Sequence, residues 1–461
     1  MRKNKTFRGG EPFWANACVG ENGMPDYYEY AKGFSEASNI LIEAALSNSG
    51  CDHAVDIMIY PICFNMRHSV ELRLKGAVVI LSKLASSRQQ LPEFNLEGSH
   101  DIGGIWEYLS RELNSFDARL GFFTDALDPF IRDFADIDPT GQTFRYPYSN
   151  ENVKHLTDIP TINVGILQRV FAALELLLDH FKNFLLELND EYALKTHTKR
   201  LSRHQILKIA SETPAAQEWG TPAFSKFKDR MKATYNIGSK ELTEALNIVK
   251  GLYTHRFSPF TPPKLKFLTK DKIEKLFEAW IFINQPEEKA LKASRALRIT
   301  SDSDSDSDSD SMRDHFAIAI EKDRRRESIW DDLAASFSKD ELADLTALYE
   351  VGDSNYAEHY PFNVEYYQNE FKNGSYSYDG GANETLLRLI KKPRALQRMI
   401  KTLFLTGQYS LADSLAEKYS HVGNLDWLQM AREDQLFIEP CETIKTNCAM
   451  RFKELVESFD S

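Results

Sequence analysis

The stretch FNMRHSVELRLKGA, residues 64–77, opens a strongly periodic segment that predicts a helix over residues 61–86. Its apolar residues recur every three or four positions and therefore share one helix face. That face is formed by Met66, Val70, Leu74, Ala77, Leu81 and Leu84. Arg67, Glu71 and Lys75 are spaced four apart beside it, so their charges can pair along the helix. The segment predicts one helix of a bundle, with a row of charges next to its buried face.

The composition is that of a globular protein of more than one domain. The chain has 461 residues, which is too long for one ordinary core, and 42% of them are hydrophobic. The net charge of −12 argues against a protein that coats nucleic acid by overall charge. The five cysteines show no metal-ligand spacing, and an odd number favours reduced thiols. With a polar start and no long apolar run, we expect a cytoplasmic protein without a membrane span.

The pattern along the chain predicts an all-α fold of several helical bundles. Residues 301–311 alternate Ser and Asp strictly, so they cannot form a core and are expected to be a disordered linker. The expected parts are an irregular lead-in (1–27), a first bundle (28–192), a second small bundle (193–290), the linker (291–312) and a C-terminal helical domain of unknown role (313–461).

Three further expectations concern single segments. The first helix is expected to bury Ala31, Phe34, Ala37, Ile40, Leu41 and Ala44. Residues 162–188 are apolar on most sides, which predicts a helix at the centre of the first bundle. The tyrosine-rich residues 356–378 are expected to form a loop.

Two short motifs follow the helix at 61–86: Ser99-His100-Asp101, which opens a predicted helix, and Phe144-Arg145-Tyr146-Pro147. The order F-x-x-R-H-x-x-E-x-x-x-K, then H-D, then R-Y-P resembles the HEPN superfamily of helical bundles, over about residues 55–190. The matching residues are Phe64, Arg67, His68, Glu71, Lys75, His100, Asp101, Arg145, Tyr146 and Pro147.

The resemblance implies a homodimer formed through the first bundle that binds RNA or a nucleotide. In HEPN nucleases, an Arg is followed after four to six residues by a His. Here Arg145 matches the Arg, but Ser149, Asn150 and Glu151 stand where the His is expected, and the next histidine is His155. An imidazole can take the 2′-hydroxyl proton of RNA, and a guanidinium can hold the phosphate. The resemblance therefore implies a metal-independent endoribonuclease, without a cofactor.

The candidate catalytic residues are Arg145, His155 and His68, and His100 is a further source of the imidazole. A loop over residues 147–154 would return His155 to Arg145, since Pro147 disfavours a continuous helix there. The candidate substrate-binding residues are Arg67, Glu71, Lys75, His100, Asp101 and Asn150.

Structural roles compete with each of these assignments. Arg145 can bridge Glu71 or Asp101 inside the bundle, a His-Asp pair can cap a helix, and Glu71 can form a buried ion pair with Lys75. No Gly-rich phosphate loop, metalloprotease motif or serine hydrolase motif is present in the sequence.

The resemblance favours an RNA-directed toxin of bacterial antiviral defence or stress response, gated by the C-terminal domain. The alternatives are a non-catalytic module that binds a nucleotide or a protein, and a helical scaffold. Growth arrest on expression, relieved by Arg145→Ala, separates the toxin from the other two.

Overall fold

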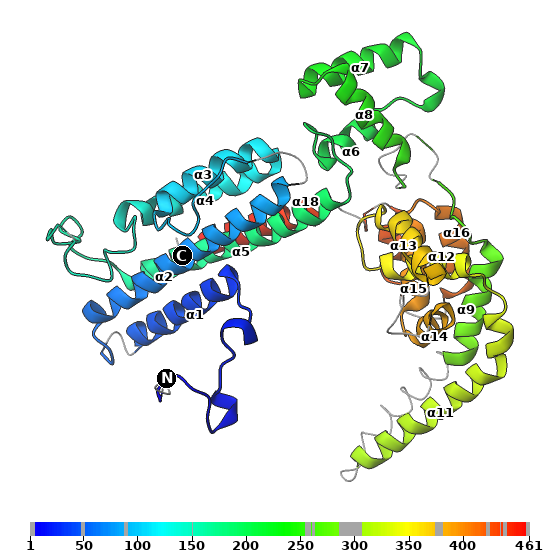
Figure 1. The fold of residues 1–461 in the computed structure, drawn as a ribbon, viewed down its shortest axis with the longest axis horizontal. Helices are drawn as coiled ribbons and strands as arrows, with labels where there is room; N and C mark the ends of the chain where they lie inside the picture. The colour runs from blue at the N-terminus through cyan, green and yellow to red at the C-terminus, as the bar shows by residue number, and fades with distance from the viewer. Residues whose placement is uncertain are drawn as a thin grey trace. The chain divides into compact units, whose positions relative to one another are not determined.

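The computed structural model describes residues 5–47, 51–86, 91–149, 151–253, 260, 263–284, 307–373, 381–420, 425–433, 435–436 and 440–457. All regular elements in these residues are helices, which confirms the predicted all-α fold class (Figure 1). The chain divides into two compact units. Unit 1 combines Met1–Ala193 with Pro440–Ser461, and unit 2 is Leu194–Glu439.

Unit 1 is a bundle of six α-helices around one hydrophobic core. Two short 3₁₀ helices, η1 (Phe13–Ala15) and η2 (Gly20–Asn22), precede it, and a third, η4 (Ala118–Leu120), links α3 to α4. The helices are α1 (Tyr27–Leu46), α2 (Val55–Ala85), α3 (Ile102–Phe116), α4 (Gly121–Ile137), α5 (Val164–Ala193) and α18 (Pro440–Glu457). The core runs through all six of them.

The buried face of α2 is the one that the sequence predicts, because the six apolar residues expected on that face, from Met66 to Leu84, are all within the core. The prediction for α1 is wrong in register. Ile40 is 65% exposed, and the buried face instead carries Ser35 and Ser38. The Ser35 hydroxyl lies 2.7 Å from that of Ser69, and Ser38 donates to the carbonyl of Ile62. Small hydroxyl residues let α1 approach α2 closely and satisfy their own hydrogen bonds, so apolar periodicity misses this face.

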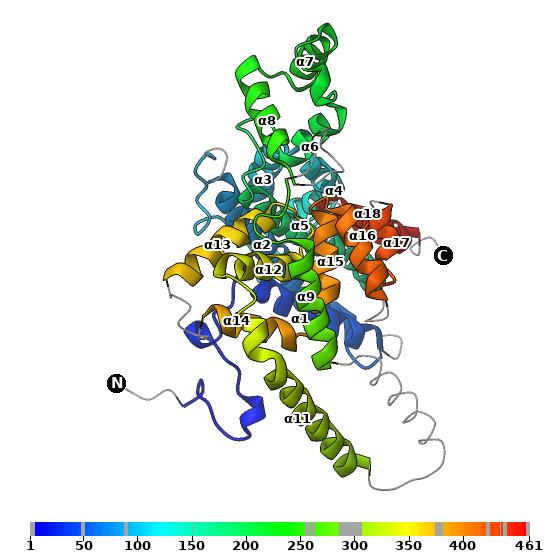
Figure 2. The ribbon, with the colours of Figure 1, turned by 90° about the vertical axis from the view of Figure 1, so that its right-hand side faces the viewer.

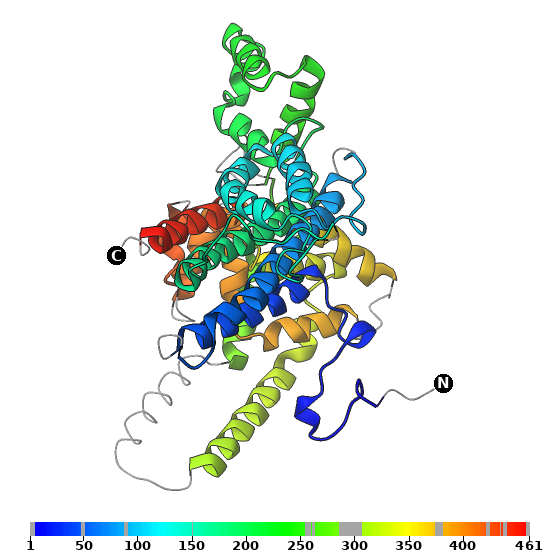
Figure 3. The same cartoon turned by 90° about the vertical axis from the view of Figure 1, so that its left-hand side faces the viewer.

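Helix α5 lies at the centre of unit 1, as predicted, and packs against α1, α2, α4 and α18. Figures 1 and 3 show α18, in red, alongside α5, although nearly 250 residues separate the two helices in the chain. The buried Cys441 and Cys448 attach α18 to the core, and the ring of Phe452 meets Phe130 of α4 edge-on. Burial raises the pKa of both thiols.

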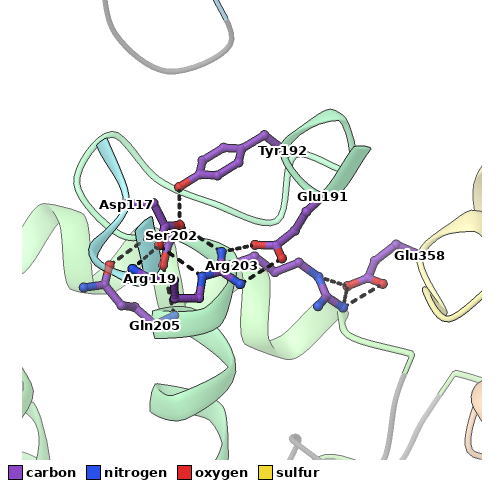
Figure 4. Close-up of polar contacts among 8 residues, drawn as sticks. All are labelled: Asp117, Arg119, Glu191, Tyr192, Ser202, Arg203, Gln205 and Glu358. Atoms are coloured by element: carbon purple, nitrogen blue, oxygen red, sulfur yellow. Dashed lines mark hydrogen bonds and ion pairs between the residues drawn. The ribbon is translucent and has the colours of Figure 1, made fainter. Parts of the chain in front are cut away.

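A buried charged cluster forms where α5 ends (Figure 4). Arg119 donates to Asp117 and Glu191, with N–O distances of 2.7–3.0 Å, and Tyr192 donates to Asp117 at 3.2 Å. Burial alone would raise the pKa of Asp117, but hydrogen bonds and charge from Arg119 lower it overall. Breaking one arm of such a cluster would leave a buried charge without its partner.

Unit 2 begins with a three-helix module that has its own core. Its helices are α6 (Arg203–Glu212), α7 (Pro222–Tyr235) and α8 (Ser239–Gly251), with the 3₁₀ helix η5 (Ala216–Glu218) between α6 and α7. Ser202 and Gln205 form a capping box at the start of α6, and Arg203 donates to both carboxylate oxygens of Glu358 (Figure 4). Asn236, in the left-handed conformation, ends α7.

The remaining helices of unit 2 share a second core, and Figure 2 shows α12 beside α13 and α15 beside α16. They are α9 (Lys270–Asn284), α11 (Ser307–Ala334), α12 (Lys339–Val351), α13 (His359–Asn373), α14 (Ala382–Lys391), α15 (Ala395–Leu405), α16 (Tyr409–Lys418) and α17 (Leu428–Arg432). Helix α13 corrects the loop expected over residues 356–378. Tyr360 and Tyr367 of this helix are core residues, whereas Tyr366 is exposed, and residues 374–378 of the expected loop lie outside the described residues.

This division differs from the expected one in two places. Helix α9, expected in the small bundle of residues 193–290, packs in the core of the later helices. Residues 440–457, expected in a C-terminal domain, complete unit 1 as α18. Residues 285–306, which include most of the expected linker, lie outside the described residues, and the backbone of residues 307–312 is already helical as the start of α11.

Candidate functional site

The connection between α4 and α5 folds into a narrow loop that brings Arg145 and His155 near each other. The backbone N–H groups of Arg145 and Tyr146 donate to the carbonyl of Gln142, which forms a turn. Beyond Pro147, Tyr148 pairs with Lys154 in an antiparallel bridge. The N–H of His155 donates to the carbonyl of Pro147 at 3.2 Å. The loop over residues 147–154 therefore returns His155 to the neighbourhood of Arg145.

Arg145 and His155 line the same pocket, which has a volume of about 810 Å³. One wall is the N-terminal part of α2, and the other is the loop before α5. Sequence reasoning missed five polar residues that line this pocket: Asp56, Tyr60, Thr143, Lys154 and Thr161. Tyr60 lies one helical turn before Phe64 and therefore on the same helix face as the first residue of the motif. This spacing could have identified Tyr60 from the sequence. Nothing in the sequence singles out Asp56 or Lys154.

The guanidinium of Arg145 is exposed and has no carboxylate partner among the described residues. It lies 5.2 Å from the ring centre of Tyr146 and 5.8 Å from that of Phe64. The side chain donates a hydrogen bond of 3.3 Å to the Tyr146 hydroxyl. The structural alternative, in which Arg145 bridges Glu71 or Asp101, is therefore wrong. Two aromatic rings position this cation, and apart from the bond to Tyr146 its N–H groups can donate to an anion.

The imidazole of His155 is half-buried, and its Nε2 atom has no hydrogen-bond partner among the described residues. A buried ring nitrogen without a partner is uncommon in a folded protein. The ring is held by a loop whose backbone hydrogen bonds fix its position, including that from Ser149 to the carbonyl of Val153. The pocket is thus lined by a cation that no carboxylate neutralises and by an imidazole with a buried ring nitrogen that has no hydrogen-bond partner among the described residues.

His68 does not line this pocket. Its ring is nearly parallel to that of Phe64, with centroids 5.8 Å apart, and meets Phe34 edge-on at 4.5 Å. Its Nδ1 atom lies 3.8 Å from a Glu71 oxygen. The structure therefore separates His68 from the other candidate catalytic residues, with the ring of Phe64 lying against both His68 and Arg145.

Four of the candidate substrate-binding residues form a charged network inside unit 1. Glu71 accepts from Arg67, from Lys75 at 3.0 Å and pairs with His100 Nδ1 at 3.0 Å. Arg67 also donates to the backbone carbonyls of Asp138, Pro139 and His100. Arg67, Glu71 and Lys75 are at most 6% exposed.

The partners of Glu71 determine its charge state. Burial alone would raise the pKa of this carboxyl, but hydrogen bonds from His68, Lys75 and His100 and the charge of Arg67 outweigh it. The pKa is therefore held well below its usual value. The network fastens α2 to the start of α3 and to the loop after α4. Gly141 of that loop, at φ +78°, allows the backbone to approach the Arg67 guanidinium.

Two other predicted residues have different outcomes. Asp101 caps α3 by accepting from the N–H of Gly103 at 3.0 Å, which is the structural alternative considered for the His-Asp pair. Asn150 lies outside the described residues. Within the described residues there is no cluster of three or more His, Cys, Asp or Glu side chains that could hold a metal ion. None of the helices there combines the length and apolarity needed to cross a membrane.

The chain matches no protein-family model, no curated protein and no solved structure. An interpretation of its function therefore depends on the geometry of the site and on the chemistry of its residues.

Proposed function

We propose that unit 1 is a HEPN-like module that binds RNA in the Arg145–His155 pocket and cleaves its backbone without a metal ion. The observation that carries the proposal is that one pocket is lined by a guanidinium without a carboxylate partner and by an imidazole whose Nε2 atom has no hydrogen-bond partner, both among the described residues. These are the two groups that metal-independent cleavage of RNA requires. The volume of about 810 Å³ is in the range of pockets that hold small molecules, so one nucleotide fits.

In the proposed reaction, His155 accepts the proton of a 2′-hydroxyl, and the 2′-oxygen attacks the adjacent phosphorus. The bond from phosphorus to the 5′-oxygen of the next nucleotide breaks, and that oxygen takes a proton from water. The products are a 2′,3′-cyclic phosphate and a 5′-hydroxyl, and His155 returns its proton to solvent. Arg145 donates to the phosphoryl oxygens as negative charge develops on them. Tyr60 and Tyr146 offer ring faces for a base.

The proposal includes a homodimer formed through unit 1. Two large side chains that lie beside the pocket without lining it are exposed: Ile57 by 70% and Tyr148 by 52%. A second copy that covered them would remove this area from water. Size-exclusion chromatography with light scattering tests this, because Ile57→Glu should yield monomers.

Gating by residues 313–439 is also part of the proposal. These residues belong to a unit that is joined to unit 1 by two chain connections, one after α5 and one before α18. A change in unit 2 can therefore act on unit 1 through either connection. As an effector of antiviral defence, the protein should slow cell growth when it is expressed, and more strongly when this control is released.

Cleavage of a labelled single-stranded RNA by the purified chain tests the central claim. Arg145→Ala and His155→Gln should each lower the rate by about 10²–10³-fold, the usual cost of removing one such group. The matched control is Arg132→Ala, which removes another exposed arginine of unit 1 that pairs with Asp128 at 2.8 Å. Equal rates for Arg145→Ala and Arg132→Ala would refute the assignment.

A second function, binding of a nucleotide without cleavage, is favoured by the burial of the His155 Nε2 atom. In that case the wild-type chain leaves RNA intact, and a fluorescent nucleotide binds with an affinity that depends on Arg145. The same variants distinguish the two functions, because only cleavage produces a 2′,3′-cyclic phosphate.

A further inference from the structure

The three-helix module, residues 194–253, has a charge opposite to that of the whole chain. It contains eleven lysines and arginines against five aspartates and glutamates, a net charge of +6, whereas the chain carries −12. A concentrated positive charge on an acidic protein raises the local concentration of polyanions. The charge density of this module therefore indicates an anionic partner.

Three cations of this module lie over a series of aromatic rings. Trp219 stacks on Phe224 with ring centroids 4.5 Å apart, and Phe224 stacks on Phe227 at 5.9 Å. A cation lies over each of these rings: Lys250 is 4.7 Å from Trp219, Lys228 is 5.2 Å from Phe224, and Arg230 is 5.9 Å from Phe227. Lysines from both α7 and α8 are thus held on one ridge of the module.

Two of these cations, Lys228 and Lys250, are available to a partner, and so is the exposed Lys226 of α7, which lies over none of the rings. Arg230 pairs with Glu212 at 2.9 Å, and Lys232 pairs with Asp229 at 2.8 Å. Within the described part of the chain, no carboxylate pairs with Lys226, Lys228 or Lys250.

The scaffold beneath the ridge is well defined. Leu242, Ala245 and Val249 of α8 belong to the buried core of the module. Figure 4 shows the capping box of α6 and the Arg203–Glu358 ion pair that fastens this helix within unit 2. Lys228 and Lys250 are also held against rings, which reduces the entropy lost when they bind.

The module lacks the features of a membrane or apolar protein contact. No large hydrophobic side chain among its described residues is highly exposed, although several are exposed in unit 1. A membrane-surface helix or a protein interface needs apolar anchors. Binding to the phosphodiester backbone of nucleic acid needs only a row of cations.

We propose that residues 194–253 bind the phosphodiester backbone of nucleic acid, with Lys226, Lys228 and Lys250 contacting phosphates. This binding site is separate from the Arg145–His155 pocket and does not depend on cleavage there. Because the contacts are to phosphates, affinity should be nearly independent of base sequence and should fall steeply with salt.

Fluorescence anisotropy on the full chain tests the proposal, with a labelled 30-nucleotide RNA, the same RNA as a duplex, and a DNA duplex. The Arg145→Ala background prevents cleavage during the measurement. The triple variant K226Q/K228Q/K250Q should bind single-stranded RNA about a hundredfold less tightly at 0.1 M salt, since each phosphate contact contributes about 0.7 to the salt slope. The slope itself should fall by about 2.

The matched control, K32Q/K83Q/K453Q, removes the same charge from exposed lysines of unit 1 and should change affinity little. Lys226→Gln alone removes a lysine that lies over none of the three rings, so it should not affect folding, and it should weaken binding about fivefold. Comparison of the RNA and DNA probes identifies the nucleic acid that supplies the backbone. Equal losses in the two triple variants would overturn the proposal, as would equally tight, lysine-dependent binding to phosphatidylserine vesicles.

Discussion

Replacing Glu71 with glutamine should strongly destabilise unit 1. The side chain keeps its size but loses the negative charge that Arg67, Lys75 and His100 share. Arg67 and Lys75 are 2% and 6% exposed, so water cannot compensate them. Breaking a buried ion pair from one side costs about 3–5 kcal/mol. For a unit of this size, that loss corresponds to a fall in Tm of roughly 6–20 °C.

The control is Glu36→Gln, which removes an ion pair of the same helical spacing from the surface of the same unit. Glu36 lies 3.8 Å from Lys32, and both side chains are more than 60% exposed. Such a pair contributes about 0.5 kcal/mol or less. Differential scanning calorimetry of the wild type and both variants measures the difference. If Glu71→Gln lowers Tm no further than Glu36→Gln does, the network does not stabilise the bundle as argued.

The stabilisation by Glu71, measured as the difference in Tm between wild type and Glu71→Gln, should depend on pH. The pKa of Glu71 is lower in the folded protein than in the unfolded chain, where a glutamate titrates near about 4.3. Its contribution is therefore complete above about pH 4.3 and is lost as the pH falls toward the folded pKa. The difference in Tm between wild type and Glu71→Gln should narrow below about pH 4, and a constant difference would contradict this linkage.

Two further predictions concern packing. Gly352→Ala should destabilise unit 2 by about 1–3 kcal/mol, because the new Cβ would lie 2.5 Å from the Cβ of Arg398 and 2.6 Å from its carbonyl oxygen. Urea unfolding measures this loss of stability, and a neutral effect would show that the end of α12 can move away from α15. A thiol reagent should modify the exposed Cys18 and Cys51 rapidly, and the three buried cysteines, including Cys441 of α18, only on unfolding. Mass spectrometry of partly labelled protein checks this, and rapid labelling of Cys441 would mean that α18 separates readily from the core.

Sequence periodicity predicted the helices of the core well where burial is purely apolar. The apolar face of α2 from Met66 to Leu84 is an example, because its side chains are buried by apolar packing and need no hydrogen-bond partner. Helix α1 differs, because Ser35 and Ser38 are buried and form hydrogen bonds to α2. The sequence pattern of one helix does not show which polar residues find a partner on another helix. The return of α18 to unit 1 depends on contacts between residues more than 200 positions apart, and local pattern carries no information on these.

The candidate site was predictable in part. The need for a loop to return His155 to Arg145 followed from Pro147, and the observed loop has this effect. The division between buried and exposed charges was not predictable, since Arg67 and Arg145 both lie in motifs of similar polarity. Three backbone carbonyls and Glu71 bind Arg67, whereas the contacts of Arg145 within the described part of the chain are with Phe64 and Tyr146. Tertiary structure alone decides which cation is free.

The chain order of α5 and α18 has a consequence for biosynthesis. The ribosome must add the 246 residues from Leu194 to Glu439 after it completes α5 and before it begins α18. At common translation rates this takes roughly 12 to 50 seconds. During that time the surface of α5 that later receives α18 has no intramolecular cover, so nascent chains are open to chaperones and to one another. Unit 1 can reach its final form only after translation of unit 2, however quickly its first five helices assemble.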